Sequence, residues 1–286
     1  MKIGIMFANV GPFGLPDHLE NLARTAEEVG IESLWTVEHV VVPVGYTSEY
    51  PYSPTGRMPG PESSPIPDPV LPLVFCAAVT RKIKLGTGIL ILPQRHPAYV
   101  AKEFATLDQL SGGRAILGVG IGWLREEFEA VGVPFDERVA RTEEAILAIR
   151  SLWRDGAEAF EGKYYRWGPV ESNPKPVQPG GVPIVIGGHV KGAARRAARY
   201  GNGFFPARGD EARIAELIGV IRDECQKIGR DPAEIEISCG AQADDIDAVK
   251  RLEDLGVSRI AIGPPGFDKD AVRKGLEQIG NVIAKL

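Results

Sequence analysis

The chain has 286 residues, of which 44% are hydrophobic and 25% charged, and its formal net charge is −5. This length is enough to bury one large core and falls in the range typical of an eight-stranded α/β barrel. The negative charge gives no general attraction to nucleic acid or to an anionic membrane, so neither is expected as a partner.

The cysteines and the apolar segments exclude further classes of protein. Cys76, Cys225 and Cys239 are far apart and show no CxxC spacing, so we expect neither a disulfide framework nor a zinc site. No run approaches the ~20 apolar residues of a membrane span. The apolar start of the chain is too short for a signal sequence and is typical of a buried strand. We therefore expect a cytoplasmic protein that holds no metal.

Short apolar runs alternate with longer amphipathic segments eight times along the chain. Continuously apolar runs are typical of parallel strands that are covered on both faces. The segments between them have helical periodicity, as when Leu19, Leu22, Ala23, Ala26 and Val29 share one stripe. The runs predicted as strands are 3–8, 33–37, 84–92, 115–119, 183–187, 203–206, 235–240 and 258–263.

The same alternation occurs in a doubly wound open sheet, so it does not by itself require a closed barrel. Eight repeats favour the barrel. The first predicted strand is not followed by GxGxxG, which disfavours a dinucleotide-binding sheet and a standard NAD enzyme. The prediction is an α/β protein whose residues 1–286 form a single (β/α)8 TIM barrel.

Two stretches interrupt the alternation. Residues 40–69 follow the second strand, are rich in proline and carry Tyr46, Tyr50 and Tyr52. The prolines exclude a helix, and the position places this insertion at the catalytic mouth of a barrel. It is interpreted as a lid or substrate-pocket loop, with a passive surface insertion as the alternative. The second stretch, 156–182, is predicted to be an ordered insertion before the fifth strand.

The side chains just past the strand ends of a barrel converge on one mouth, whatever their separation in sequence. Glu38 and His39 form a carboxylate–imidazole pair at the end of the second strand. An imidazole is suited to proton donation or to stabilising a reduced cofactor, so we predict that both residues are catalytic. The alternative is a histidine that only caps a turn.

Two glycine-rich turns lead directly into predicted helices. Gly118–Gly122 precedes a helix that starts near Trp123, and Gly187–Gly188 precedes a helix that contains Arg195 and Arg196. Free backbone N–H groups and the helix dipole could face an anion at either place, although such glycines also serve tight turns alone. Together the two turns predict a phosphorylated cofactor.

Further residues at the mouth complete the predicted cofactor site. Arg95 is a candidate for contacting a negatively charged cofactor tail, whereas the neighbouring His96 is expected to make a local structural contact. Ala207–Arg208 and Pro264–Pro265 also follow strands. The residues predicted to bind the cofactor are Asn9, Thr87, Gly88, Ile89, Arg95, Gly120, Ile121, Gly122, Trp123, Gly187, Gly188 and His189.

Several of these segments form a long motif. It runs from Gly86-Thr87-Gly88-Ile89 to Arg95-His96-Pro97, continues through Ala105 to Arg114, and reaches Leu117-Gly118-Val119-Gly120-Ile121-Gly122-Trp123. This motif resembles the bacterial luciferase-like monooxygenase superfamily. The proline-rich insertion, the segment from Gly122 to Phe128 and the segment from Pro183 to His189 are similar to its branch of coenzyme F420-dependent oxidoreductases. The similarity weakens after about residue 210.

The resemblance implies a barrel that holds a flavin or a deazaflavin, with its phosphate near the fourth and fifth strand ends. It also implies a non-prolyl cis peptide bond at Gly88–Ile89 behind the ring, and it matches Glu38–His39 to an acid–histidine pair, although Asp is the more usual acid. A sugar-phosphate dehydrogenase of the superfamily has a carboxylate at the end of the first strand, where this chain has Asn9. Its substrate is therefore not carried over.

The leading functional prediction is hydride transfer between coenzyme F420 and a small, partly apolar organic substrate, with His39 as proton donor or stabiliser of charge. The first alternative is an FMN-dependent monooxygenase that receives reduced FMN from a separate reductase. The second is a non-catalytic flavin- or deazaflavin-binding protein. Relatives are often dimers, so a homodimer is expected.

Overall fold

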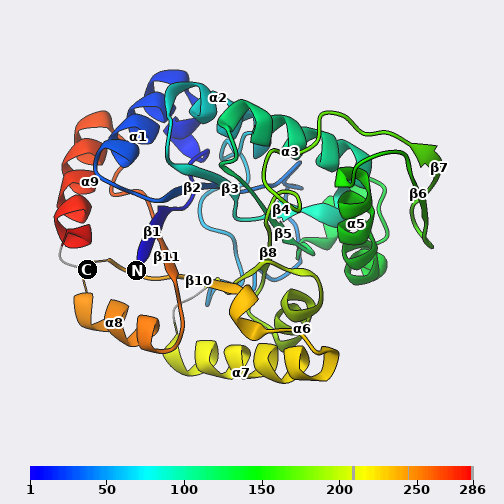
Figure 1. The fold of residues 1–286 in the computed structure, drawn as a ribbon. Helices are drawn as coiled ribbons and strands as arrows, with labels where there is room; N and C mark the ends of the chain where they lie inside the picture. Colours follow the sequence, from blue (N-terminus) through cyan, green and yellow to red (C-terminus); the bar gives the residue numbers. More distant parts are fainter. Residues whose placement is uncertain (208–209, 244, 285–286) are drawn as a thin grey trace.

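The computed structural model describes residues 1–207, 210–243 and 245–284, and its central feature is a closed parallel barrel with helices outside it (Figure 1). The strand order β3-β2-β1-β11-β10-β9-β8-β5 is closed by pairing between β3 and β5. Closure confirms the predicted TIM barrel over the open sheet. The barrel strands are β1 (Lys2–Ile5), β2 (Ser33–Thr36), β3 (Lys84–Thr87), β5 (Ala115–Gly120), β8 (Ile184–Gly187), β9 (Gly203–Phe205), β10 (Glu236–Gly240) and β11 (Arg259–Ile262).

The helices cover the outside of the barrel with their apolar faces. In the first helix, Leu19, Leu22, Ala23 and Ala26 of the predicted stripe are buried in the core, which removes apolar surface from water, whereas Val29 lies just past the helix and is partly buried. The helices are α1 (Pro16–Glu28), α2 (Val70–Val79), α3 (Pro97–Ser111), α4 (Arg125–Ala130), α5 (Arg138–Trp153), α6 (Lys191–Tyr200), α7 (Glu211–Ile228), α8 (Ile246–Asp254) and α9 (Lys269–Ile283).

Side chains fill the inside of the barrel. Trp35 is fully buried there and its ring packs edge-on against Phe205, with 5.5 Å between the ring centroids. A Cβ atom on Gly4 or Gly86 would lie 2.7 Å from the Trp35 ring. These two strand glycines therefore leave room for the indole, and the barrel interior is a packed core.

The third strand differs from its prediction. A single strand over 84–92 was wrong, because β3 ends at Thr87 and a separate strand, β4 (Leu90–Ile91), pairs with Val119 and Gly120 of β5. Between β3 and β4 the backbone leaves the ladder at the Gly88–Ile89 peptide bond, which is cis, as the family resemblance implies.

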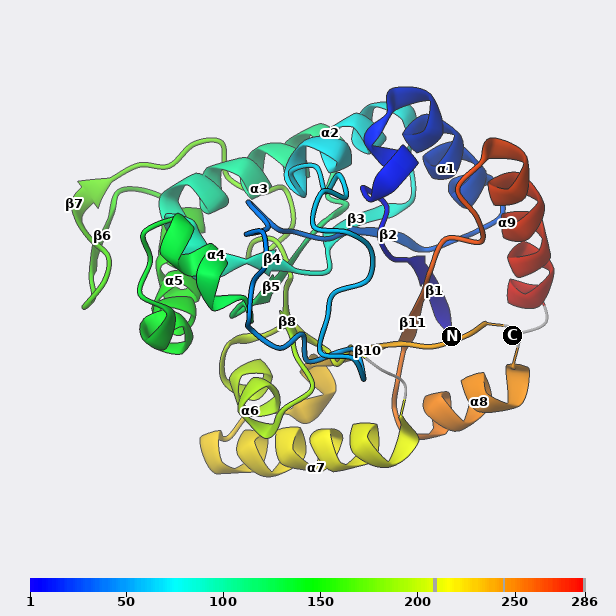
Figure 2. The ribbon, with the colours of Figure 1, turned by 180° about the vertical axis from the view of Figure 1, so that it is seen from behind.

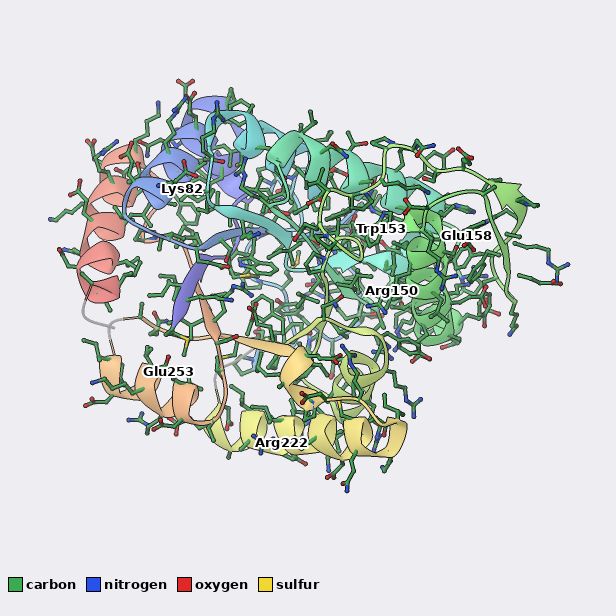
Figure 3. All side chains as sticks on the ribbon, viewed as in Figure 1. Lys82, Arg150, Trp153, Glu158, Arg222 and Glu253 are labelled. Atoms are coloured by element: carbon green, nitrogen blue, oxygen red, sulfur yellow. The ribbon has the colours of Figure 1, made fainter. Side chains whose placement is uncertain are left out.

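The insertion before the fifth barrel strand contains regular secondary structure. It contains an antiparallel hairpin of β6 (Glu158–Glu161) and β7 (Arg166–Val170). Figure 3 places Trp153, at the end of α5, and Glu158 on this side of the molecule, outside the barrel. Asp108 of α3 accepts hydrogen bonds from the backbone N–H groups of Val177 and Gln178, at 2.8 and 3.0 Å. The insertion is thus fixed to the barrel wall.

The proline-rich insertion contains neither helix nor strand over 40–69, as its composition predicts. It runs across the end of the barrel that carries α4 and the carboxyl ends of the strands (Figure 2). Among the described residues, no helix has the length and apolar character needed to cross a bilayer.

Candidate active site

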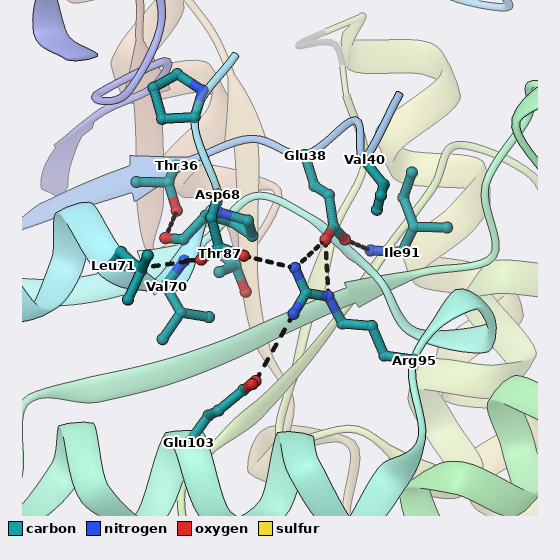
Figure 4. A network of polar contacts seen from close by, with 12 residues as sticks. Thr36, Glu38, Val40, Asp68, Val70, Leu71, Thr87, Ile91, Arg95 and Glu103 are labelled. Atoms are coloured by element: carbon teal, nitrogen blue, oxygen red, sulfur yellow. Dashed lines mark hydrogen bonds and ion pairs between the residues drawn. The ribbon is translucent and has the colours of Figure 1, made fainter. Parts of the chain in front are cut away.

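Glu38, just after the end of β2, belongs to a polar network that centres on the Arg95 guanidinium (Figure 4). The Glu38 side chain is 1% exposed, and it accepts hydrogen bonds from the backbone N–H of Ile91 and from the Arg95 guanidinium, whose Nε lies 2.8 Å away. Arg95 also donates to Asp68 at 2.8 Å and lies 3.8 Å from the carboxylate of Glu103. Both oxygens of Glu38 are therefore engaged in joining β2, β4 and the start of α3.

The pKa values in this network follow from burial and from Arg95. Burial raises the pKa of Glu38 and of Glu103. For Asp68, burial is opposed by hydrogen bonds from Arg95 and from backbone N–H groups, and its pKa is lowered. Burial likewise opposes the charge of Arg95, but the carboxylates around it raise its pKa. The Arg95 guanidinium, predicted to contact a cofactor tail, is thus bound to three carboxylates of this chain.

His39 is held by a carboxylate that the sequence did not indicate. Its Nδ1 lies 2.9 Å from Oε2 of Glu127, which is on α4 and has no exposed side-chain surface. The other oxygen of Glu127 accepts hydrogen bonds from the backbone N–H groups of Val40, at 2.6 Å, and Val41, at 3.4 Å. The His39 ring also packs edge-on against Trp123 at 5.7 Å. His39 is thus fixed from α4 at the mouth of the barrel.

Two residues predicted to bind the cofactor make their side-chain hydrogen bonds to other parts of this chain. The buried Asn9 side chain donates to the carbonyls of Val37, at 2.8 Å, and Pro67, at 2.9 Å, and accepts from the backbone N–H of Val37. The hydroxyl of Thr87 donates to the Gly118 carbonyl at 2.7 Å and accepts from its N–H at 3.0 Å. Asn9 therefore links the residue after β2 to Pro67 near the end of the proline-rich insertion, and Thr87 joins β3 to β5.

The glycines at the ends of β5 and β8 make room for Ile89. A Cβ atom on Gly120 would lie 2.5 Å from Cδ1 of Ile89, and one on Gly187 would lie 2.5 Å from its Cγ2. Gly122 has a φ of +77° and packs near Phe128, and Ile121 beside it is partly buried. These contacts explain three of the predicted phosphate-site glycines by packing against this chain's own side chains.

The helices α4 and α6 both begin at the mouth, but their first turns differ in the charge of their side chains. The first turn of α4 carries Glu126 and Glu127, which does not favour an anion. The first turn of α6 carries no acidic residue and no side-chain cap, and a Cβ atom on Gly192 would have open space around it. Gly188, which precedes this turn, has a φ of +125°. The start of α6 therefore keeps the features of an anion site, and that of α4 does not.

Aromatic rings line the mouth beneath the proline-rich insertion. Trp123 packs edge-on against Tyr46 at 5.5 Å and Tyr50 at 5.1 Å, and Tyr52 lies 4.9 Å from the His189 ring. Burial raises the pKa of the Tyr52 hydroxyl to about 12. The contact between Tyr52 and His189 joins the insertion after β2 to the loop after β8, so the insertion spans the mouth.

A second acidic residue of α4 fixes the insertion. Glu126 accepts hydrogen bonds from the backbone N–H and hydroxyl groups of Thr47 and Ser48, at 2.6 to 3.1 Å. Burial opposes its charge, but the hydrogen bonds from Ser48 and Thr47 lower its pKa to about 2. Sequence reasoning missed Glu126 and Glu127, although both lie shortly after the glycine-rich turn. The signal was a pair of acids in the first turn of a helix at the mouth.

The remaining predicted residues lie apart from this cluster. His96 caps α3 by accepting a hydrogen bond from the N–H of Ala98, at 3.3 Å, which confirms its structural role. Arg208 lies outside the described residues. A groove of about 530 Å³ lies at the other end of the barrel, lined among others by Arg222 and Glu236, and contains no predicted site residue. The described residues show no cluster of three or more potential metal ligands.

The closed barrel, the cis peptide bond after β3 and the acid–histidine pair after β2 agree with what the resemblance to the luciferase-like superfamily implies. Residues 2–252 match the family model described as luciferase-like monooxygenase, and the chain belongs to this family. An uncharacterized protein of Mycobacterium tuberculosis is 34% identical over 93% of this chain and 94% of its own length.

Other relatives have named activities. An F420-dependent glucose-6-phosphate dehydrogenase of Kineococcus radiotolerans is 33% identical over 77% of this chain and 62% of its own length. The crystal structure of the monooxygenase RslO1 from Streptomyces bottropensis has a TM-score of 0.76 and 26% identity, covering 100% of this chain and 99% of that one. The relatives support an oxidoreductase of the F420-dependent branch, with a deazaflavin or flavin as cofactor.

Proposed function

We propose that this protein is an oxidoreductase that binds coenzyme F420 at the mouth of its barrel and acts on a small, partly apolar organic substrate. The observation that carries the proposal is His39, held at the mouth by a buried carboxylate and packed against Trp123. When bound, the coenzyme would supply or accept the hydride. His39 would donate or accept the accompanying proton.

The residues around the mouth fit such a coenzyme at two points. The first turn of α6, with Gly188 and Gly192, offers backbone N–H groups without acidic neighbours and fits a phosphate. Ile89, which follows β3 and is partly buried, would contact the ring of the coenzyme through its apolar side chain. The aromatic rings of Tyr46, Tyr50 and Trp123 would exclude water and favour a substrate with apolar groups.

A second candidate is an FMN-dependent monooxygenase supplied by a separate reductase. The similarity to RslO1 over the full chain favours this candidate. Arg95 does not help to distinguish coenzyme F420 from FMN, because its guanidinium is engaged with Glu38 and Asp68. Homodimer formation and a cytoplasmic location remain predictions for either activity.

Titration of the purified apoprotein with coenzyme F420 and, separately, with FMN tests the proposal. The expected result is quenching of fluorescence with tight binding of coenzyme F420. Tight binding of FMN without binding of coenzyme F420 would overturn the proposal in favour of the monooxygenase. Binding of neither would overturn the proposal and argue against both activities.

A further inference from the structure

We infer that Glu127 is a positioning residue that fixes the ring of His39 as its Nδ1–H tautomer, which leaves Nε2 for the substrate. This inference rests on the proposed role of His39 and deepens it. It starts from three donors that converge on one carboxylate: the backbone N–H groups of Val40 and Val41 at Oε1 and the imidazole Nδ1 at Oε2.

The chemistry of these groups decides where the ring proton lies. An ionised carboxylate only accepts hydrogen bonds, so the His39 Nδ1 at 2.9 Å from Oε2 must carry the proton. In the neutral ring Nε2 then carries a lone pair. It can take up a proton from a substrate that loses a hydride to the coenzyme, and the carboxylate of Glu127 stabilises the resulting imidazolium.

Among the described residues, the other contacts recorded for the His39 ring bring no competing charge to Nδ1. Trp123 packs edge-on against His39 from the turn before α4 and carries no charge. On the chain beside His39, the carboxylate of Glu38 is engaged by Arg95 and by the backbone of Ile91. Within the described part of the chain, Glu127 is thus the titratable group that the structure places in contact with Nδ1 of His39.

A substitution at this position makes the inference testable because the backbone fixes its orientation. In Glu127→Gln, the carbonyl oxygen must face the two N–H groups of Val40 and Val41, since an amide NH₂ there would oppose two donors. The NH₂ group then faces Nδ1 of His39 and donates to it. The ring proton is forced to Nε2, so the substitution inverts the tautomer.

The experiment is ¹⁵N NMR of protein labelled at its histidine rings, without coenzyme, in a pH series carried upward until the ring ¹⁵N shifts of His39 stop changing. The chain has four histidines, and the signals lost in His39→Ala assign the ring. We expect the Nδ1–H pattern in the wild type and the Nε2–H pattern in Glu127→Gln. Glu126→Gln, on the same helix but hydrogen-bonded to Thr47 and Ser48, should keep the wild-type pattern.

Two results would overturn the inference: an Nε2–H pattern in the wild type, or an unchanged pattern in Glu127→Gln that is folded by circular dichroism. If that variant does not fold, the wild-type spectrum alone decides. Because the measurement needs no coenzyme, its outcome is separate from that of the titration. Failure to bind coenzyme F420 would overturn the proposed function and leave the tautomer result standing.

Discussion

Glu38 and His39 are adjacent in sequence but have different surroundings. Glu38 is enclosed by Arg95 and the backbone of Ile91, whereas His39 is held through one ring nitrogen by Glu127. A carboxylate with both oxygens engaged is suited to holding the loop and Arg95 in place. The imidazole keeps a second nitrogen for chemistry, so His39 is the residue at which we expect proton transfer.

Replacement of His39 by alanine is expected to lower kcat by about 10²- to 10⁴-fold, the usual contribution of a positioned acid or base. Coenzyme affinity should stay within a few fold of the wild type, because the proposed phosphate contacts lie on α6. Turnover kinetics and coenzyme titration measure the two effects. His96→Ala, at the cap of α3, is the control and should retain turnover. Loss of binding equal to the loss of turnover would mean that His39 is structural.

At the scale of elements, α4 holds the proline-rich insertion at two successive residues. Glu127 binds the backbone just after His39, and Glu126 binds Thr47 and Ser48 further along the insertion. Asn9 binds Val37, which precedes the insertion, and Pro67 near its end. These anchors favour the interpretation of the insertion as a lid over the mouth rather than as a passive surface loop.

The hold of Glu126 on the insertion should depend on pH. Its pKa is lowered from 4.5 to about 2 in the folded protein, so the folded state binds this proton less readily than the unfolded state. The stabilisation is therefore present above pH 4.5 and is lost as the pH falls towards 2. The difference in unfolding free energy between the wild type and Glu126→Gln should narrow over this interval in urea titrations.

The matched control for this pH dependence is Glu129→Gln, which changes an exposed carboxylate on the same helix. Its stability relative to the wild type should vary less with pH between 4.5 and 2 than that of Glu126→Gln. A difference for Glu126→Gln that stays constant over this interval would contradict the role assigned to the carboxylate.

At the scale of the whole molecule, a buried arginine links neighbouring segments at the end of the barrel opposite the mouth. Arg259 of β11 is 2% exposed and binds Glu32, which precedes β2, with 2.7 and 2.8 Å between nitrogen and oxygen atoms. It also binds Glu236 and, at 3.1 Å, Ser238, both of β10. Burial opposes the charge of Glu32, but Arg259 lowers its pKa. Arg259 thus joins three neighbouring parts of the barrel.

Substitution of Arg259 by leucine is expected to lower the free energy of unfolding by about 3–5 kcal/mol, because it leaves the carboxylates without their buried partner. Urea unfolding followed by circular dichroism measures this loss. Arg251→Leu, which breaks an exposed pair with Glu211, should cost less than about 1 kcal/mol. Equal small losses for both variants would show that the Arg259 network adds little to stability.

The sequence by itself determined the eight strands, the insertions and the position of Glu38, His39 and the glycine turns at one mouth. These features depend on local patterns, since apolar runs and prolines specify elements wherever they lie in the chain. Only the tertiary structure decided which side chains bind one another at the mouth. His39 and Glu127 are 88 residues apart and Glu38 and Arg95 are 57 apart. Such pairs form because closure of the barrel brings the ends of distant strands side by side. The periodicity of the sequence predicts elements but does not predict which of these ends become neighbours.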